Sequence, residues 1–306
     1  MRVLVFSDPH NADNPPRMRK EGYREEILEK QRLLVSISKE CDLTVCTGDV
    51  FHSKRAEHVS YKLMNEICEI YREFPRMLIV PGNHDIDTRM DWSDRPLGIL
   101  AKLPNIRVLH NATFKYGAFD VAFKLWGGGE FFSVKEMMGF MEDSVKGTSK
   151  VIAVVHASIA EGMYYPFEYT QISSIVPFCD FLILGHLHDF QYARPHCLAT
   201  GGLSRGVLTF DANLLRPVYY GIVEVGEDIQ CELCDIPVKP AEEVFKVEKK
   251  VLEGKQKETV DGFVEFIQNL KIPKNLNRED AIVYIKQLSD VKEEVKREAI
   301  KVLEEL

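Results

Sequence analysis

The chain has 306 residues, which is enough for one large domain or for a large domain and a smaller one. Its composition, 45% hydrophobic and 28% charged, is ordinary for a globular protein, and no stretch approaches the roughly 18 uninterrupted apolar residues of a membrane span. The net charge of −8 argues against a protein that binds nucleic acid over its whole surface, because phosphates are bound by Lys and Arg.

The N-terminus reads MRVLVFSDPH, and Asp8 interrupts this apolar run too early for a secretory signal. We therefore expect a cytoplasmic protein. The seven cysteines are an odd number scattered through apolar segments, which indicates reduced thiols rather than a disulfide framework. Cys231 and Cys234 form a lone CxxC, and without a second pair they do not predict a zinc ribbon.

Five short apolar runs, each ending on polar residues, are typical of strands buried on both faces. They are RVLVFSDPH (2–10), DLTVCTGDV (42–50), RMLIVPGNHD (76–85), KVIAVVHAS (150–158) and DFLILGHLH (180–188). Helices are predicted between the first three, over 23–40 and 58–74. Their apolar stripes are Ile27, Leu33, Leu34 and Ile37, and Leu63, Met64, Ile67 and Ile70. This alternation predicts βαβ units, in which ligands bind at the carboxyl ends of the strands.

After about residue 200 the pattern changes to shorter, antiparallel strands, at GVLTF (206–210), VYYGIVEV (218–225) and IQCELCDI (229–236). The last part predicts strand, helix, strand and helix over 243–252, 257–270, 281–288 and 291–306. We therefore predict a main domain over 1–240 and a small α+β domain over 241–306.

The polar residues at the predicted strand ends are the candidate site. They are Asp8, His10, Asp49, Asn83, His84, His156, His186 and His188. Oxygen and nitrogen ligands without a thiolate suit Mn²⁺, Fe or Zn²⁺. So many ligands can hold two cations about 3.5–4 Å apart, with one carboxylate between them. Such a pair lowers the pKa of a water between them toward ~7 and stabilises the attacking and leaving oxygens of a phosphoryl transfer.

Each motif alone has a simpler interpretation. Gly48-Asp49 is a common turn sequence, Asn83 favours turns, and a histidine such as His156 after an apolar run is often a core residue. The motifs occur together, however, and each closes an apolar run. Their combination therefore predicts a metal site, with Asp49 as the residue that bridges the two cations.

The series Asp-x-His, Gly-Asp, Gly-Asn-His-Asp, a histidine after a strand and Gly-His-x-His resembles the calcineurin-like metallophosphoesterase superfamily over residues 1 to about 225. The resemblance implies an α/β (α+β) fold, a four-layer αββα sandwich of two mixed sheets flanked by helices. It implies a first metal held by Asp8, His10, Asp49 and His188, and a second held by Asp49, Asn83, His156 and His186. It also places His84 near the leaving-group oxygen, with Asp85 orienting it.

The segment GDVFHS is similar to a segment of the SbcD-type DNA double-strand-break-repair nucleases, in which His52 would help engage the DNA strand. The segment TGGLSRG resembles that family's Pro-Gly-Ser-x-x-Arg stretch, but Thr200, Gly202 and Ser204 depart from it while Arg205 is kept. The tail over 241–306 resembles that family's small capping domain.

The leading interpretation is therefore an SbcD-like, Mn²⁺-dependent DNA nuclease, an exonuclease, a single-strand endonuclease or both, acting in DNA repair or recombination. The candidate DNA contacts are Arg17, Lys54, Arg55, Arg89 and Arg205. The resemblance also implies a homodimer, formed through the apolar stripe of the helix around 58–73, and an SbcC-like ATPase partner.

Two other interpretations remain open at this point. In the first, the same metal chemistry acts on nucleotides or other small phosphate esters, and the C-terminal tail is a lid. In the second, the chain is a scaffold that kept the fold and lost catalysis. Scaffolds of this kind lack ligands, whereas none of the expected ligands is missing here.

Overall fold

The computed structural model describes residues 1–16, 18–53, 59–87, 91–128, 134–143, 145–161, 169–205 and 216–246. The chain divides into two compact units, Met1–Lys246 and Val247–Leu306, and the second unit lies outside the described residues. The expected boundary at 240 therefore falls six residues earlier than this division. The predicted elements over 257–306 and the predicted strand GVLTF (206–210) also lie outside the described residues.

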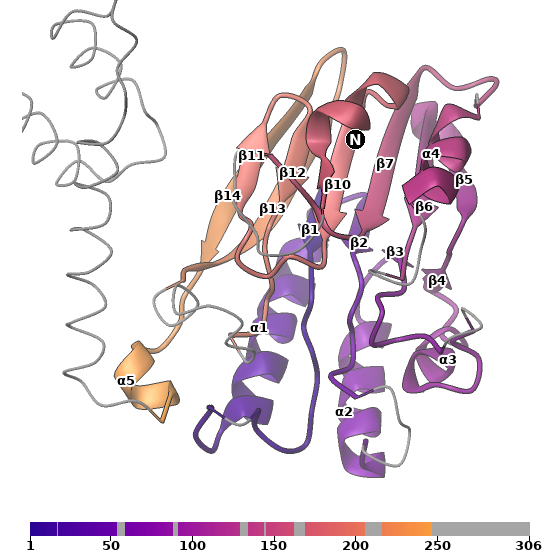
Figure 1. Cartoon of the computed structure of the whole chain (residues 1–306). Helices are drawn as coiled ribbons and strands as arrows, with labels where there is room; N and C mark the ends of the chain where they lie inside the picture. The colour runs from indigo at the N-terminus through magenta and orange to yellow at the C-terminus, as the bar shows by residue number, and fades with distance from the viewer. Residues whose placement is uncertain are drawn as a thin grey trace, which may run out of the picture. The chain divides into compact units, whose positions relative to one another are not determined.

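The first unit contains two six-stranded mixed sheets (Figure 1). The first sheet has the order β14-β13-β1-β2-β3-β4, in which β1 to β4 are parallel and β13 and β14 complete the sheet in antiparallel pairing. Its strands are β1 (Arg2–Phe6), β2 (Leu43–Cys46), β3 (Met77–Ile79), β4 (Ile106–Val108), β13 (Val218–Val225) and β14 (Ile229–Ile236).

The second sheet has the order β11-β12-β10-β7-β6-β5, with β12, β10, β7 and β6 parallel and an antiparallel strand at each edge. Its strands are β5 (Ala112–Tyr116), β6 (Val121–Trp126), β7 (Lys150–His156), β10 (Phe181–Gly185), β11 (Tyr192–Arg194) and β12 (Cys197–Ala199). A separate parallel pair joins β8 (Ile159–Ala160) to β9 (Thr170–Gln171). All five strand-forming runs predicted from the sequence are present, as β1, β2, β3, β7 and β10.

Alternating side chains along each strand divide the interior into three apolar layers. Val3 and Val5 of β1 pack with Ile152 and Val154 of β7 between the two sheets. Leu4 and its neighbours on the other face of the first sheet pack against α1 (Tyr23–Ser38), α2 (Tyr61–Arg72) and α3 (Pro96–Leu100). The outer face of the second sheet packs against α4 (Val134–Glu142) and the 3₁₀ turns Ile172–Ser174 and Val176–Phe178. The expected four-layer αββα sandwich is therefore the observed fold.

The two predicted helices form as α1 and α2, and they lie side by side in Figure 1. In α2 the whole predicted stripe is buried in the chain's own core. These apolar side chains pack within the chain, and the homodimer stays a prediction. In α1 the stripe differs from the prediction: Leu33 is 38% exposed, whereas Lys30 and Gln31 are buried.

The end of the first unit also differs from the prediction. Residues 243–252 were expected to form a strand, but Glu243 and Val244 belong to the short helix α5 (Ala241–Val244). Phe245 then pairs with Arg19 in an isolated β-bridge. A third 3₁₀ turn spans Gly117–Phe119. No helix among the described residues has the length and apolarity that a membrane span requires.

The cysteines are all free thiols, as expected. Cys231 and Cys234 both lie in β14, where side chains three positions apart point to opposite faces of the sheet. Cys231 packs in the layer between the sheets and Cys234 in the layer under the helices. The two thiols therefore do not form a chelating pair.

Candidate metal centre

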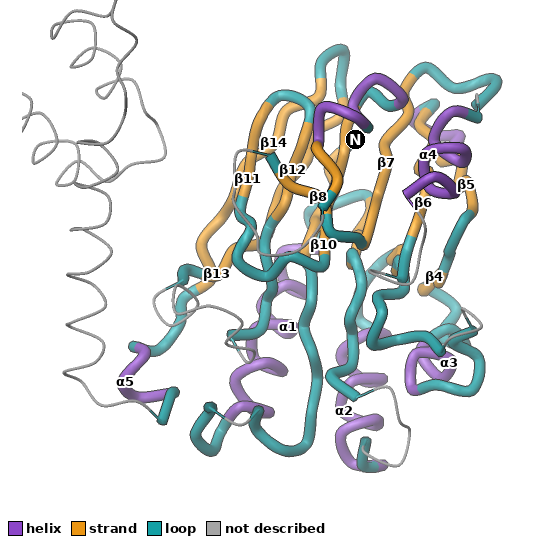
Figure 2. Tube along the Cα trace, in the orientation of Figure 1, coloured by secondary structure: helices purple, strands orange, loops and turns teal. Residues whose placement is uncertain are grey.

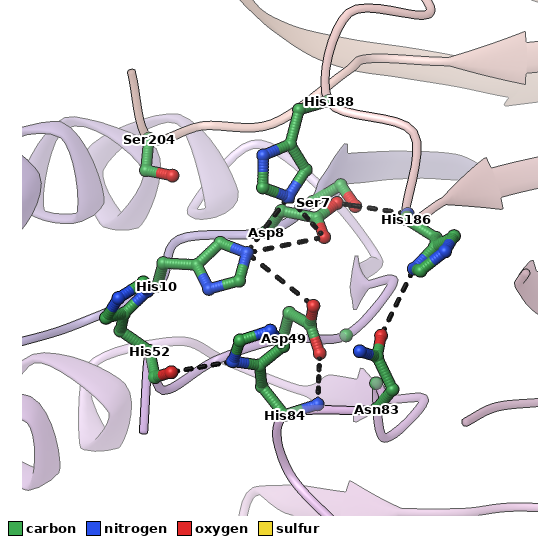
Figure 3. A network of polar contacts seen from close by, with 12 residues as sticks. Ser7, Asp8, His10, Asp49, His52, Asn83, His84, His186, His188 and Ser204 are labelled. Carbon is green, nitrogen blue, oxygen red and sulfur yellow. Dashed lines mark hydrogen bonds and ion pairs between the residues drawn. The ribbon is translucent and has the colours of Figure 1, made fainter. Parts of the chain in front are cut away.

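The predicted ligands come together because they all follow the carboxyl ends of parallel strands. In the first sheet, Asp8, Asp49 and Asn83 follow the neighbouring strands β1, β2 and β3. In the second sheet, His156 is the last residue of β7, and His186 comes directly after its neighbour β10. Figure 2 shows the loops that continue from these strands, and Figure 3 shows the side chains converging.

The backbone at four of the seven ligand positions has a positive φ angle, which is uncommon for residues with a side chain. The φ angles are 50° at Asp8, 47° at His10, 50° at Asp49 and 91° at His186. Gly48 has a φ of 111°, and a Cβ there would lie 2.5 Å from Nδ1 of His156. Strained backbone of this kind gathers at functional sites, where the surrounding structure holds it in place.

The first ligand group consists of Asp8, His10, Asp49 and His188, whose ligand atoms all lie within 4.8 Å of one another. Nε2 of His10 lies 3.5 Å from Oδ2 of Asp49 and 2.9 Å from Nε2 of His188. Nε2 of His188 lies 3.3 Å from Oδ1 of Asp8. That carboxylate oxygen is buried and has no hydrogen-bond partner among the described residues. A buried acceptor without a donor fits a position beside a cation.

The second group contains Asp49, His156 and His186, with the same 4.8 Å limit between ligand atoms. Oδ1 of Asn83 joins it, 3.3 Å from Nε2 of His156 and 3.1 Å from Nδ1 of His186. Nδ1 of His156 lies 2.5 Å from the carbonyl oxygen of Thr47, so this nitrogen carries the proton and donates it. Nε2 is thereby left as the metal-binding nitrogen, in the arrangement usual for a ligating histidine.

Asp49 belongs to both groups, so the donor set fits two divalent cations that share one carboxylate. The resemblance to metallophosphoesterases implied this division of ligands, and all seven predicted metal ligands lie in these two groups. The donors are imidazole nitrogens, carboxylate oxygens and an amide oxygen, which suit borderline to hard metals.

Electrostatics keep the carboxylates ionised. Burial alone would raise the pKa of Asp49, but His156, His10 and His84 outweigh it and hold this pKa well below its usual value. Burial alone would likewise raise the pKa of Asp8, but His188 and His156 outweigh it and hold this pKa below its usual value. Asp49 in turn raises the pKa of His156 to about 9 against the effect of burial. Burial lowers the pKa of His186 to about 4, so this ligand is neutral at pH 7.

His84 and His52 lie beside the first group. The backbone N–H of His84 donates to Oδ1 of Asp49 at 2.8 Å, and its Nδ1 lies 2.6 Å from the carbonyl oxygen of His52. Because a carbonyl only accepts, Nδ1 of His84 is the donor, and Nε2 is left available. The two rings are stacked with their centroids 5.8 Å apart.

The expectation that Asp85 orients His84 is corrected by the contacts of both residues. Asp85 is buried and accepts hydrogen bonds from the backbone N–H groups of Val50, Phe51 and Gly82, at 3.2, 3.3 and 3.0 Å. Its carboxylate therefore ties the loop after β2 to the loop after β3. The His52 carbonyl, not Asp85, is the partner of the His84 ring.

Of the candidate DNA contacts, only Arg205 is among the described residues; Arg17, Lys54, Arg55 and Arg89 lie outside them. Arg205 is 4% exposed. Its guanidinium donates to the carbonyl oxygen of Lys239 at 2.9 Å and lies 5.3 Å from the ring centroid of Phe245. This arginine is held inside the fold, which does not fit the expected contact with a DNA strand.

Sequence reasoning missed several residues that support the ligands. Ser7 donates to Asp8, and Thr47 donates to Ser7 at 2.5 Å. Their position directly before the Asp8 and Gly48-Asp49 motifs was the only available signal. Tyr23 donates its buried hydroxyl to the carbonyl oxygen of His10 at 2.9 Å, a contact that nothing in the sequence predicts.

The fold and the site define a metallophosphoesterase-type α/β sandwich. The family model for calcineurin-like phosphoesterases matches residues 1–190, and the chain belongs to this family. No curated protein matches the sequence.

Several solved structures are similar to this chain at low identity. A 5'-nucleotidase precursor from Thermus thermophilus has 12% identity and a TM-score of 0.47, covering 77% of this chain and 54% of its own. The purple acid phosphatase PPD1 from yellow lupin has 12% identity and a TM-score of 0.48, covering 77% and 51%. NAD nucleotidase from Haemophilus influenzae has 12% identity and a TM-score of 0.41, covering 86% and 56%. This chain therefore spans about half the length of these three proteins.

Proposed function

We propose that the chain hydrolyses phosphoesters with the help of two divalent cations. The observation that carries the proposal is the presence of two adjoining ligand groups with Asp49 in both. When bound, such a pair of cations activates water and stabilises the charge on the oxygens of an in-line displacement. Membership of the calcineurin-like phosphoesterase family supports the same chemistry.

The chain's own residues supply positioning and proton transfer. The carbonyl of His52 fixes the His84 ring through Nδ1, so Nε2 is the atom that meets the leaving-group oxygen. His84 there either donates a proton or stabilises the developing charge. The backbone N–H of His84 also holds the shared carboxylate of Asp49, so the ring and the ligand keep a fixed relation.

We expect the cations to be Mn²⁺. The donors of the two groups mix imidazole with carboxylate and amide oxygen, and carboxylate and carbonyl oxygens suit Mn²⁺. Equilibrium dialysis of the metal-free protein against Mn²⁺ tests this expectation, with two ions per chain as the predicted result. One ion or none would contradict a two-cation centre.

One candidate substrate is a DNA phosphodiester, cleaved as in an SbcD-type nuclease. The supporting observation is His52, which lies in the segment GDVFHS and stacks on His84 beside the first ligand group. A half-buried histidine at that place is positioned to contact a phosphate next to the scissile one. A homodimer and an SbcC-like ATPase partner, which rest on the resemblance alone, belong to the same proposal, as does a cytoplasmic location.

A small phosphate ester, such as a nucleotide, is the second candidate substrate, and more observations support it. Two observations favour it: the net charge of −8, and the internal position of Arg205. The similar structures named above are nucleotidases and a phosphatase, and their likeness to this chain is one of fold.

The experiment that separates the candidates compares Mn²⁺-dependent cleavage of end-labelled single- and double-stranded DNA with hydrolysis of an aryl phosphodiester. The nuclease is supported if the wild type degrades DNA and if His52→Ser slows DNA degradation more than it slows hydrolysis of the aryl ester. Fast turnover of the small ester with inert DNA supports the second candidate. Asp49→Asn serves as the inactive control, and no hydrolysis of any phosphoester by the wild type would overturn the proposal.

A further inference from the structure

Three imidazoles from three different loops gather on one side of the metal centre. His10 follows β1, His52 follows β2 and His84 follows β3, and their ligand atoms lie within 4.8 Å of one another. Ring centroids are 5.5 Å apart for His10 and His52, 4.9 Å for His10 and His84, and 5.8 Å for His52 and His84. In Figure 3 the three rings lie together, on the opposite side of Asp49 from Asn83 and His186.

Two nitrogens of this trio have no hydrogen-bond partner among the described residues. They are Nδ1 of His10 and Nδ1 of His52, and both atoms are buried. A buried polar atom without a partner is destabilising, so its presence requires an explanation. The third ring, His84, uses Nδ1 to donate to the His52 carbonyl and keeps its Nε2 available.

The two ring nitrogens of His10 have different surroundings. Nε2 lies against Asp49 and His188 and belongs to the first ligand group. Nδ1 has no partner in that group. The ring of His10 therefore stands between the two-cation centre and the histidine trio. When Nε2 binds a cation of the centre, Nδ1 carries the ring proton. A second cation binds at Nδ1 only with release of that proton to solvent, which leaves the ring as an imidazolate between the two cations.

We propose that His10, His52 and His84 form a third cation site, selective for Zn²⁺, whose occupation blocks the centre. A tetrahedral zinc bound by imidazoles at about 2.0–2.1 Å places its ligand nitrogens about 3.4 Å apart. The 4.8 Å limit observed here exceeds this, so binding requires the rings of His10 and His52 to move toward His84, whose own ring the His52 carbonyl holds. His10 is buried, and His52 and His84 are half-buried.

The donor chemistry sets the selectivity. The trio contains three imidazoles and no carboxylate, whereas both groups around Asp49 contain a carboxylate. Imidazole nitrogen binds Zn²⁺ more strongly than Mn²⁺, and Mn²⁺ is the weakest binder of the first-row divalent series. The same order favours Zn²⁺ over Mn²⁺ at the groups around Asp49, so the first equivalent of zinc enters the trio only where those groups are already filled with Mn²⁺ and keep it.

The inhibitory part of this inference rests on the proposed function. Zinc in the trio occupies Nε2 of His84, the atom assigned to the leaving-group oxygen, and also immobilises His52. Hydrolysis therefore stops without loss of the two Mn²⁺ ions. This differs from inhibition in which zinc replaces manganese, and the two are separable by measurement.

The test titrates the full-length protein, loaded with two equivalents of Mn²⁺, with Zn²⁺ in competition with a chromophoric chelator. Electron paramagnetic resonance follows free Mn²⁺ in the same samples. We expect one equivalent of zinc to bind without release of manganese, and His52→Gln to weaken that binding at least tenfold. His196→Gln is the matched control, because His196 is exposed and outside the trio, and its zinc binding should equal that of the wild type.

Manganese release in step with zinc binding would overturn the proposal, as would unchanged zinc binding in His52→Gln. If circular dichroism shows that His52→Gln does not fold, His84→Gln replaces it with the same expected result. A second readout is hydrolysis by the Mn²⁺-loaded enzyme, which one equivalent of zinc should abolish. Zinc binding without inhibition would overturn the blocking role. If no phosphoester is hydrolysed at all, the binding titration still decides whether the third site exists.

Discussion

The main-chain N–H of His84 donates to Oδ1 of Asp49, so the candidate proton donor and the carboxylate shared by both ligand groups are fixed to each other. The His52 carbonyl holds the His84 ring from the other side. Asp85 ties the two loops together through backbone N–H groups of Val50, Phe51 and Gly82. The position of the reactive ring is therefore set by the main chain after β2 and β3.

Replacing His84 with alanine should separate catalysis from Mn²⁺ binding. Its ring belongs to neither ligand group around Asp49, and its hydrogen bond to Asp49 comes from the main chain, which alanine keeps. Turnover should fall by roughly 10²–10⁴-fold, the contribution of one acid–base group. Mn²⁺ stoichiometry, measured by dialysis, should stay at two. Loss of a bound ion in this variant would contradict the separate roles.

Asp49→Asn should remove both metal binding and activity. The amide oxygen keeps the acceptor for the His84 N–H, but the charge that both groups share is lost. Changes in residues that only orient a ligand already cost about 10–100-fold in metal affinity, and loss of a shared ligand should cost more. Calorimetric titration with Mn²⁺ measures the effect, and His196→Gln should bind as the wild type does.

Tyr23→Phe should destabilise the protein and weaken the first metal group. Tyr23 donates to the carbonyl oxygen of His10, and removing the hydroxyl leaves that buried oxygen without this donor. The expected loss in unfolding free energy is about 1–2 kcal/mol, measured by urea denaturation. Tyr61→Phe is the control, because Tyr61 is 91% exposed, and it should change stability by less than about 0.5 kcal/mol.

Phe245→Ala should destabilise the first unit strongly. The Phe245 ring is fully buried, with the guanidinium carbons of Arg19 and Arg205 at 5.0 and 5.3 Å from its centroid. Truncating a buried phenylalanine costs about 3–5 kcal/mol, and two cation–π contacts are lost with it. Urea denaturation should show the loss. The same truncation at Phe119, which is 39% exposed, should cost much less.

The sequence predicted the site better than the sheets around it. Strands β1, β2, β3, β7 and β10 were predictable because each is a continuous apolar run that ends on a ligand motif. Strand β6 was missed because Lys124 interrupts its apolar run. In the structure Lys124 is buried, donates to the carbonyl oxygens of Met141 and Asp143, and lies 5.0 Å from the Phe140 ring centroid.

Tertiary partners also explain the error in α1. Leu33 was assigned to the buried stripe by its apolar character, whereas Lys30 is buried in its place. Lys30 pairs with Glu26 at 2.8 Å and donates to the carbonyl oxygen of Leu203 at 3.2 Å. Leu203 lies 173 residues further along the chain, and the period of an apolar stripe contains no information about such a partner. Strand β4, with three residues, is too short to leave a pattern.

The stability of the metal-free protein should fall as the pH rises from 6.5 to 8. Burial lowers the pKa of His156, but the Asp49 carboxylate outweighs burial and raises this pKa to about 9. The folded state therefore keeps a proton on His156 that the unfolded chain loses above pH 6.5. The stability that this proton contributes is full below pH 6.5 and lost as the pH approaches 9. One proton corresponds to about 1.4 kcal/mol per pH unit, so the loss from pH 6.5 to 8 is at most about 2 kcal/mol.

Other shifted groups act mainly outside this window, but Asp85 adds to the fall in stability near pH 7. Burial is the main cause that raises the pKa of Asp85 to about 7, so this group lowers the stability as the pH rises, mostly below pH 7. Burial lowers the pKa of His186 to about 4, so this group raises the stability as the pH rises, also below pH 7. Burial lowers the pKa of Lys30 to about 8, so this group changes the stability only above that pH.

Urea denaturation at pH 6.5, 7.25 and 8 in the presence of a chelator measures the slope of stability against pH. His156→Gln should flatten it, and an equal slope in that variant would assign the pH dependence to another group. Added Mn²⁺ should reverse the slope, because cation binding displaces the proton from His156 and is favoured at higher pH.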